Sequence, residues 1–157
     1  MGFFDTLKAM KNAVTGGAAK VSFDCDTLSY TEPFKATVRA QIGDANVNAS
    51  RVYILIEGYE KVQVPDVDVV YDVEDGTTER RVETVYASHK TVDLEVTIAD
   101  AQELEANQSY EWEVELELPS DAPSIYEGRF CQHTYKAFAG LDCFGNDPDS
   151  GWIELHD

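Results

Sequence analysis

The chain has 157 residues and is 43% hydrophobic, enough to bury a core, so we expect one domain with a short appendage rather than two domains. Its 30 acidic and 12 basic residues give a formal net charge of −18, which argues against binding nucleic acid or docking by charge onto anionic lipid. Basic proteins, cations and neutral surfaces are still possible partners. The same charge is equally consistent with a role in solubility alone.

The cysteines and the apolar stretches of the sequence indicate where in the cell the chain is located. Cys25, Cys131 and Cys143 form no CxxC pair, and the N-terminus lacks the long apolar core of a signal peptide. No stretch reaches the roughly 20 apolar residues that a membrane-spanning helix needs. We therefore expect reduced thiols, a cytoplasmic location and no membrane contact.

The first segment, GFFDTLKAMKNAV, has apolar residues at helical spacing, and Thr15, Gly16 and Gly17 follow as a stop signal. The pattern predicts an N-terminal amphipathic helix over residues 1–17 and a sandwich domain over residues 18–157. Because only Lys8 and Lys11 are basic, docking on the sandwich or on a protein partner is favoured over a membrane surface. The side chains that would form this docking face are Phe3, Phe4, Leu7 and Met10.

The rest of the chain reads as strands separated by turns. Core-type residues recur at every second position in KVSFDCD, ATVRAQIGD and RVYILIEGYEKV, and the other face of the third, with Tyr53 and Leu55, is also apolar, as in a central or covered strand. Further candidate strands are VDVVYDV, RRVETVYASH, TVDLEVTI, GRFCQHTYKAFAGLDCF and GWIELHD. The Asp75–Gly76 pair predicts a hairpin, and Pro65 predicts a strand end or an edge position, since proline cannot donate to a ladder. Eight or nine such strands predict an all-β, immunoglobulin-like antiparallel sandwich of two sheets.

The stretch SYEWEVELELP, from Ser109 to Pro119, alternates without interruption. A side-chain period of two predicts a strand with one face on the core and the other in water. Its core face would be Tyr110, Trp112, Val114, Leu116 and Leu118. The glutamates between them would form an outer face whose like charges oppose pairing with copies of itself.

Several segments together resemble the arrestin-like N-terminal domain. ELELPSDAPSIYEGRFCQHTYKAFAGLD resembles its closing half, SYTEPFKATVRAQI its second strand, with Thr31, Glu32 and Pro33 replacing the usual Pro-Gly-Glu, and VYILIEGYEKV the next strand with its glycine. The opening GFFDTLKAMKNAVTGGAAKV is similar to the start of bacterial sporulation-control proteins of the same group. The resemblance implies a sandwich that binds other proteins without catalysis. Members typically carry a second sandwich domain, for which 157 residues leave no room.

Three features of the sequence could form sites, and for each of them ordinary packing is the competing explanation. Cys131 and His133, two apart on one strand, would form a metal or nucleophilic site with Cys143 if that residue lay on a nearby strand, but buried thiols and an ordinary histidine are favoured. The acidic loop DCFGNDPDSG offers calcium ligands without the DxDxDG register, so a solvated turn is favoured there. The Met-Gly start is better explained by helix packing than by myristoylation. We expect no catalytic, metal or cofactor residues, no cofactor, and no binding role for Tyr126 or Trp152.

The leading hypothesis is a non-enzymatic, arrestin-like interaction module that binds a protein partner by strand-edge pairing or surface docking. The resemblance suggests bacterial sporulation or stress control as its setting. The alternative is a sandwich that binds divalent cations, calcium in particular, through its acidic loops.

Overall fold

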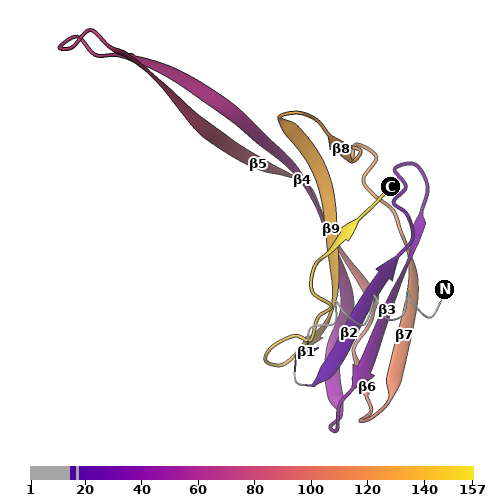
Figure 1. Cartoon of the computed structure of the whole chain (residues 1–157). Coiled ribbons are helices and arrows are strands. Elements are labelled where there is room, and N and C mark those ends of the chain that lie inside the picture. The colour runs from indigo at the N-terminus through magenta and orange to yellow at the C-terminus, as the bar shows by residue number, and fades with distance from the viewer. Residues whose placement is uncertain (1–14, 17) are drawn as a thin grey trace, which may run out of the picture.

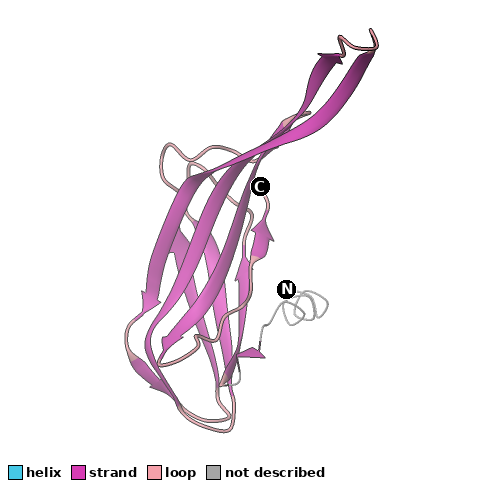
Figure 2. Ribbon diagram, turned by 90° about the vertical axis from the view of Figure 1, so that its left-hand side faces the viewer, coloured by secondary structure: helices cyan, strands magenta, loops and turns pink. Residues whose placement is uncertain are grey.

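The computed structural model describes residues 15–16 and 18–157, and these residues form strands, turns and loops (Figures 1 and 2). Within them there is no helix, hence none long and apolar enough to cross a membrane. The strands are β1 (Thr15–Gly16), β2 (Ala19–Cys25), β3 (Phe34–Ile42), β4 (Val47–Tyr71), β5 (Thr78–Ala99), β6 (Gln102–Leu104), β7 (Ser109–Leu116), β8 (Tyr126–Glu127), β9 (Cys131–Cys143) and β10 (Ile153–Leu155).

Two antiparallel sheets face each other, which confirms the predicted sandwich. The first has the order β1-β2-β3-β7, and the second has the order β10-β9-β4-β5, with β6 added to β4 and β8 added to β9. The core lies between them and includes Val21 and Val38 from the first sheet and Ile54, Ile56 and Tyr135 from the second. Strands β2 and β3 point alternate side chains inward, so in these strands the period-two pattern of the sequence is the pattern of burial.

Strand β7 confirms the interpretation of the alternating acidic stretch. It pairs with β3 and forms an edge of the first sheet. Leu116 is buried, Tyr110, Trp112 and Val114 pack against the core, and the intervening glutamates are exposed. Only one of those glutamates, Glu111, has an ion-pair partner among the described residues, the Nε of Arg39 at 2.6 Å.

Strands β4 and β5 are far longer than the sequence predicts. The segments expected as separate strands on either side of Pro65 merge into β4, and RRVETVYASH merges with TVDLEVTI into β5. The turn over 72–77 closes this hairpin with Gly76 at φ 70, which confirms the Asp75–Gly76 prediction. The pairing of β4 with β9 ends at Val62, and beyond it the hairpin leaves the sandwich as a two-stranded ribbon (Figure 1). Residues 63–86 of this ribbon are called the arm.

Two residues position the junction between body and arm. Gly58 lies where a Cβ atom would come within 2.8 Å of both the Tyr135 ring and Thr91 Oγ1, so the β4 backbone can pass Tyr135 only without a side chain. Opposite Gly58 the register of β5 shifts, because Gly58 pairs with Val92 and Tyr59 pairs with Lys90. The extra residue, Thr91, forms a bulge, a feature that increases local twist and re-aims side chains.

The predicted N-terminal helix lies outside the described residues as far as residue 14, and with it the docking face Phe3, Phe4, Leu7 and Met10. Of the predicted stop signal, Thr15 and Gly16 form β1, in register with Lys20 and Ala19. Strand pairing therefore begins before the boundary that the sequence suggested at residue 18.

Candidate functional site

The structure does not bring the candidate thiol and imidazole ligands together. Cys131 and Cys143 are the two ends of β9, a strand of 13 residues, so they are roughly 40 Å apart at the usual rise per residue. The condition for a shared site, Cys143 on a strand beside Cys131, is therefore not met. Burial, then the negative charges of Asp147 and Asp142, raise the pKa of the Cys143 thiol, which is the opposite of what a nucleophilic cysteine needs.

His133 lies in the body just below the arm. Its ring is buried, stacks on Tyr126 and meets Tyr135 edge to face, and its Nε2 lies 2.6 Å from the hydroxyl of the bulged Thr91. Its Nδ1 makes no hydrogen bond within the described part of the chain. Burial lowers the pKa of His133, with Glu60 opposing, so the ring is held neutral as a packing residue.

Beside His133, the Tyr126 hydroxyl lies 2.8 Å from Glu60 Oε1 and 2.9 Å from Cys131 Sγ. Hydrogen bonds with Cys131 and Glu60 raise the pKa of Tyr126, and hydrogen bonds from Tyr126 and Cys131 lower the pKa of the Glu60 carboxyl. These hydrogen bonds tie β8 to β9 and β4. Cys131 Sγ also lies 3.5 Å from Glu60 Oε1, so the three side chains form one small cluster.

The acidic loop uses its side chains internally. Asp147 accepts hydrogen bonds from the Cys143 backbone N–H at 3.0 Å and the Tyr53 hydroxyl at 3.2 Å, and Asp149 accepts one from the Gly151 N–H at 2.8 Å. Asp142 pairs with Arg51 at 3.1 Å. The described residues contain no group of three or more His, Cys, Asp or Glu side chains arranged to hold a metal ion. No observation favours the calcium alternative.

The arm has one apolar and one charged face. Directly paired residues point to the same side of a ribbon, and successive residues to opposite sides. One side therefore carries pairs such as Val67 with Val82 and Gln63 with Tyr86, and its only charged strand residue is Arg80. This apolar face consists of Pro65, Val67, Val69, Tyr71, Val82 and Tyr86, next to Gln63, Thr78, Arg80 and Thr84.

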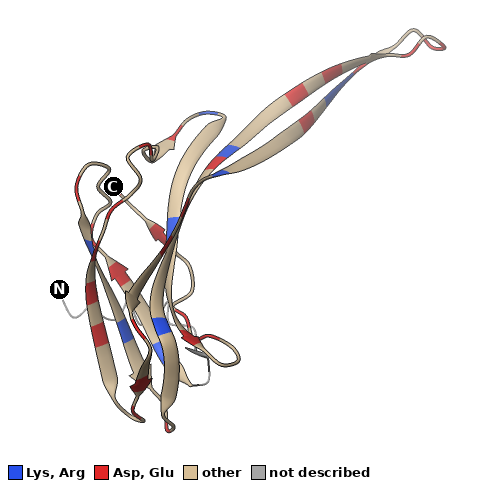
Figure 3. Cartoon of the chain, turned by 180° about the vertical axis from the view of Figure 1, so that it is seen from behind, with Lys and Arg blue, Asp and Glu red and all other residues tan. Residues whose placement is uncertain are grey.

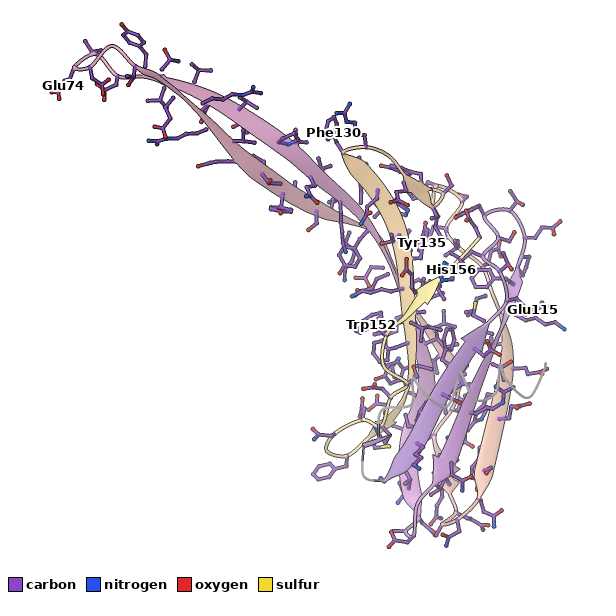
Figure 4. All side chains as sticks on the ribbon, in the orientation of Figure 1. Glu74, Glu115, Phe130, Tyr135, Trp152 and His156 are labelled. Carbon is purple, nitrogen blue, oxygen red and sulfur yellow. The ribbon has the colours of Figure 1, made fainter. Side chains whose placement is uncertain are left out.

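The opposite, charged face carries all four acids of the arm strands, Asp66, Asp68, Glu79 and Glu83, together with Arg81, Val64, Val70 and Val85. Figure 3 shows acidic residues along the arm and at its tip. Asp66 pairs with Glu83, and Asp68 pairs with Arg81, whose guanidinium also contacts Glu79 at 3.2 Å. The turn adds Asp72, Glu74 and Asp75, and Glu74 marks the far tip of the arm (Figure 4). The arm is therefore acidic on one side and at its tip, and nearly uncharged on the other side.

Among the described residues, none covers the apolar face. Tyr86 is 72% exposed, Val69 66%, Tyr71 63% and Val82 62%. Single exposed apolar side chains are common on monomers, but a contiguous exposed strip with a polar border is typical of an interaction site.

A depression of about 610 Å³ lies where the arm leaves the body. Tyr86 and Gln63 line it from the arm, and Arg129 and Phe130 line it from the turn between β8 and β9. Phe130 is 42% exposed and stands at the end of β9 nearest the arm (Figure 4). The apolar face thus continues into a hollow that also offers aromatic surface, two bases, Lys61 and Arg129, and one acid, Glu127.

Sequence reasoning missed this surface. The alternation in VDVVYDV and RRVETVYASH predicts strands with one face on a core, which is right about the strands and wrong about the core. One feature of the sequence could have indicated the arm. The alternating pattern continues on both sides of Asp75–Gly76, which is typical of a single hairpin that extends beyond the sandwich. Tyr126 and Trp152, given no binding role, lie off the arm: the Trp152 ring packs against Phe138 and lies 4.0 Å from Lys136 Nζ.

Comparison with known proteins identifies the fold. No family model matches the chain, and no curated protein matches it. Among solved structures the chain is similar to Spo0M, the sporulation control protein of Bacillus subtilis, with a TM-score of 0.58 and 17% sequence identity. The match covers 89% of this chain and 49% of that protein, so the chain spans about half its length. The chain therefore has the arrestin-like fold of that sporulation control protein, as its sequence motifs suggested.

Proposed function

We propose that this chain is a non-enzymatic protein-interaction module that receives a partner protein on the apolar face of its arm. The observation that carries the proposal is the exposed strip from Pro65 to Tyr71 on β4 and from Val82 to Tyr86 on β5. A hydrophobic side chain exposed to water gains free energy when a partner covers it, about 25 cal/mol for each Å² of apolar area.

The charge of the arm defines the partner further. The acids of the charged face and of the turn border the apolar strip, and Arg80 and Arg81 are the only bases in the arm. A partner that combines an apolar patch with a basic border would match both features, and the attraction would also speed its association. This agrees with the net charge of −18, which opposes nucleic acid and anionic lipid.

The likeness in fold to a sporulation control protein supports the setting of the proposal, a regulatory role in bacterial sporulation or stress control. Fold alone is a weak guide to activity, because sandwiches carry many functions. The proposed interaction therefore rests on the exposed apolar face of the arm. Only the proposed setting, sporulation or stress control, rests on the similarity to the sporulation control protein.

Site-specific photo-crosslinking in cells tests the proposal. A photoreactive phenylalanine analogue is placed at Tyr86 or Tyr71 on the apolar face, at Glu83 on the charged face, or at Glu115 on β7 as the control on the body. We expect one specific protein to be captured from positions 71 and 86 and not from position 115. Equal capture from position 115, or capture that Val82→Ser and Tyr86→Ser leave unchanged, would contradict it.

The same experiment separates the arm from the predicted N-terminal helix. A chain that begins at Ala18 lacks Phe3, Phe4, Leu7 and Met10 but keeps the arm. Capture from position 86 is expected to survive this truncation. Its loss would transfer recognition to the N-terminal segment.

A further inference from the structure

We propose that two copies of this chain associate by antiparallel pairing of their arm β5 edges, with Val82 of one copy opposite Val82 of the second copy. The inference concerns the edge of the arm rather than its apolar face, and it does not require the partner proposed above.

The hydrogen bonds at the two ends of the arm show which backbone groups face outward. The Gln63 N–H donates to the Phe130 carbonyl at 2.8 Å, away from β5, whereas the Asp72 N–H donates to the Thr77 carbonyl at 2.8 Å, toward β5. Backbone groups alternate sides along a strand, and the register is unbroken from Tyr59 to Tyr71. On β5 the outward N–H and C=O groups therefore belong to Thr78, Arg80, Val82, Thr84 and Tyr86.

The two edges of the arm are not equivalent. On β4 the outward positions are the odd-numbered residues, and one of them is Pro65, which has no N–H to offer. This confirms the predicted edge position of Pro65, at a point where β9 no longer covers β4. The β5 edge has no proline and no bulge from Thr78 to Lys90, and among the described residues no strand pairs with it. An open edge of this kind is a template for another strand.

Charge fixes the register of self-pairing. In an antiparallel pair, residues that lie opposite each other point to the same face of the sheet. A two-fold axis between two β5 edges must therefore pass between two copies of the same residue, and that residue defines the register. Centring on Val82 places Arg81 opposite Glu83 of the second copy, and symmetry repeats this pair. Centring on Arg81 would bring the two Arg81 side chains together, and centring on Glu83 would bring the two Glu83 side chains together. Centring on Arg80 would also place Glu79 opposite Arg81 of the second copy, but it would bring the two Arg80 side chains together. Among these registers, the Val82 register matches opposite charges without placing like charges across the axis.

The Val82 register also uses the whole free edge. It pairs Thr78 with Tyr86, Arg80 with Thr84, and Val82 with itself, so every outward residue of the arm meets an outward residue. Each such pair exchanges two backbone hydrogen bonds, and the five pairs give about ten, which is the number found in a typical protein interface.

The net charge of each copy does not forbid this contact. Val67, which pairs with Val82, is five residues beyond Val62, where the body ends, which corresponds to about 17 Å of strand. The two bodies would thus stand about 34 Å apart, several times the screening length of about 8 Å at physiological salt. The pairing would also turn two isolated hairpins, which are marginal structures, into one sheet of four strands with both apolar faces on the same side.

Sedimentation of the purified full chain tests the proposal through charge exchange. The wild-type chain is expected to dimerise, and R81E or E83R alone, which leave two like-charge contacts across the axis, should raise the dissociation constant about tenfold or more. The double variant R81E/E83R restores opposite charges and should dimerise again. An equimolar mixture of the two single variants should form a mixed dimer, because each supplies the charge that the other lacks.

Lys35→Glu on β3 is the matched control, since it changes net charge as R81E does but lies in the body. Its dimer should persist, and thermal melting should show all variants folded. A wild-type chain that stays monomeric at high concentration, single variants that dimerise like wild type, or a double variant and mixture that stay monomeric would each overturn the proposal. Because no partner protein is present, these results are independent of the crosslinking experiment.

Discussion

Strands β7 and β5 are both edge strands, and their charges are arranged in opposite ways. On β7, Glu111, Glu113 and Glu115 all point away from the core, so any antiparallel pairing of two β7 edges that keeps the faces together places glutamates opposite glutamates. In the arm, Arg81 and Glu83 flank Val82 and complement each other in one register. One edge of the molecule is thus protected against copies of itself, and the other is open to them.

A second difference separates the body from the arm. Body strands bury one face completely, as Ile54, Ile56 and Val38 show, whereas the arm strands are exposed on both faces. Side chains in the body are therefore constrained by packing, and those in the arm are constrained only by what binds there. The contrast can be tested by matched substitutions.

The largest effect is expected from a cavity in the body. Ile54→Ala removes a fully buried side chain and should lower the free energy of unfolding by about 2–5 kcal/mol. Val69→Ala in the arm removes an exposed side chain and should change it by no more than about 0.5 kcal/mol. Chemical denaturation measures both. A comparable loss from Val69→Ala would show that the arm is part of the cooperative core.

The next effect is expected at the junction between body and arm. Gly58→Ala places a methyl group within 2.8 Å of the Tyr135 ring and Thr91, and should cost about 1–3 kcal/mol by overpacking. At the arm tip, Gly76→Ala meets no atom within 4 Å and is opposed only by its φ of 70, so its cost should be about 1 kcal/mol and local to the turn. Melting temperatures of the two variants compare them. An unchanged Gly58→Ala would contradict the close approach of β4 to Tyr135.

A pH dependence should distinguish the buried His133 from an exposed histidine. Its folded-state pKa lies below the ordinary 6.5, so below pH 6.5 the unfolded chain binds more protons than the folded chain. Its contribution to stability is therefore complete above pH 6.5 and decreases as the pH falls toward the folded pKa. His133→Gln should flatten that part of the curve of melting temperature against pH, while His156→Gln, at an exposed position, should keep it. Equal slopes in wild type and His133→Gln would contradict this role.

The smallest effect is expected from removing the protection of β7. Glu113→Thr combined with Glu115→Thr leaves a strand edge with few charges and should introduce weak self-association, because cross-strand charge pairs contribute about 0.2–1 kcal/mol each. Light scattering measures it best in the R81E background, where the β5 edge is blocked. If the triple variant scatters like R81E alone, the glutamates of β7 are not what keeps that edge unpaired.

Much of the body follows from sequence periodicity. The alternation of Trp112 with Glu113, or of Val38 with Arg39, gives each strand one apolar and one polar face, so the strands themselves are set locally. The glycine in VYILIEGYEKV, Gly58, is visible in the sequence, but the reason for it is not. The ring that leaves no room for a side chain there belongs to Tyr135, 77 residues later in the chain. The distance between Cys131 and Cys143 likewise depends on both lying in one strand.

Local sequence is enough to specify that this chain makes alternating strands, which residues of each strand share a face, and where the Asp75–Gly76 turn reverses the chain, because these properties depend on neighbours within a few residues. Which apolar faces are covered depends instead on how distant segments pack together. Val21 and Val82 belong to equally regular strands, but Val21 has a second sheet across from it and is 0% exposed, while Val82 lies beyond the end of that sheet and is 62% exposed. Burial is a relation between distant segments, and the pattern within one segment does not contain it.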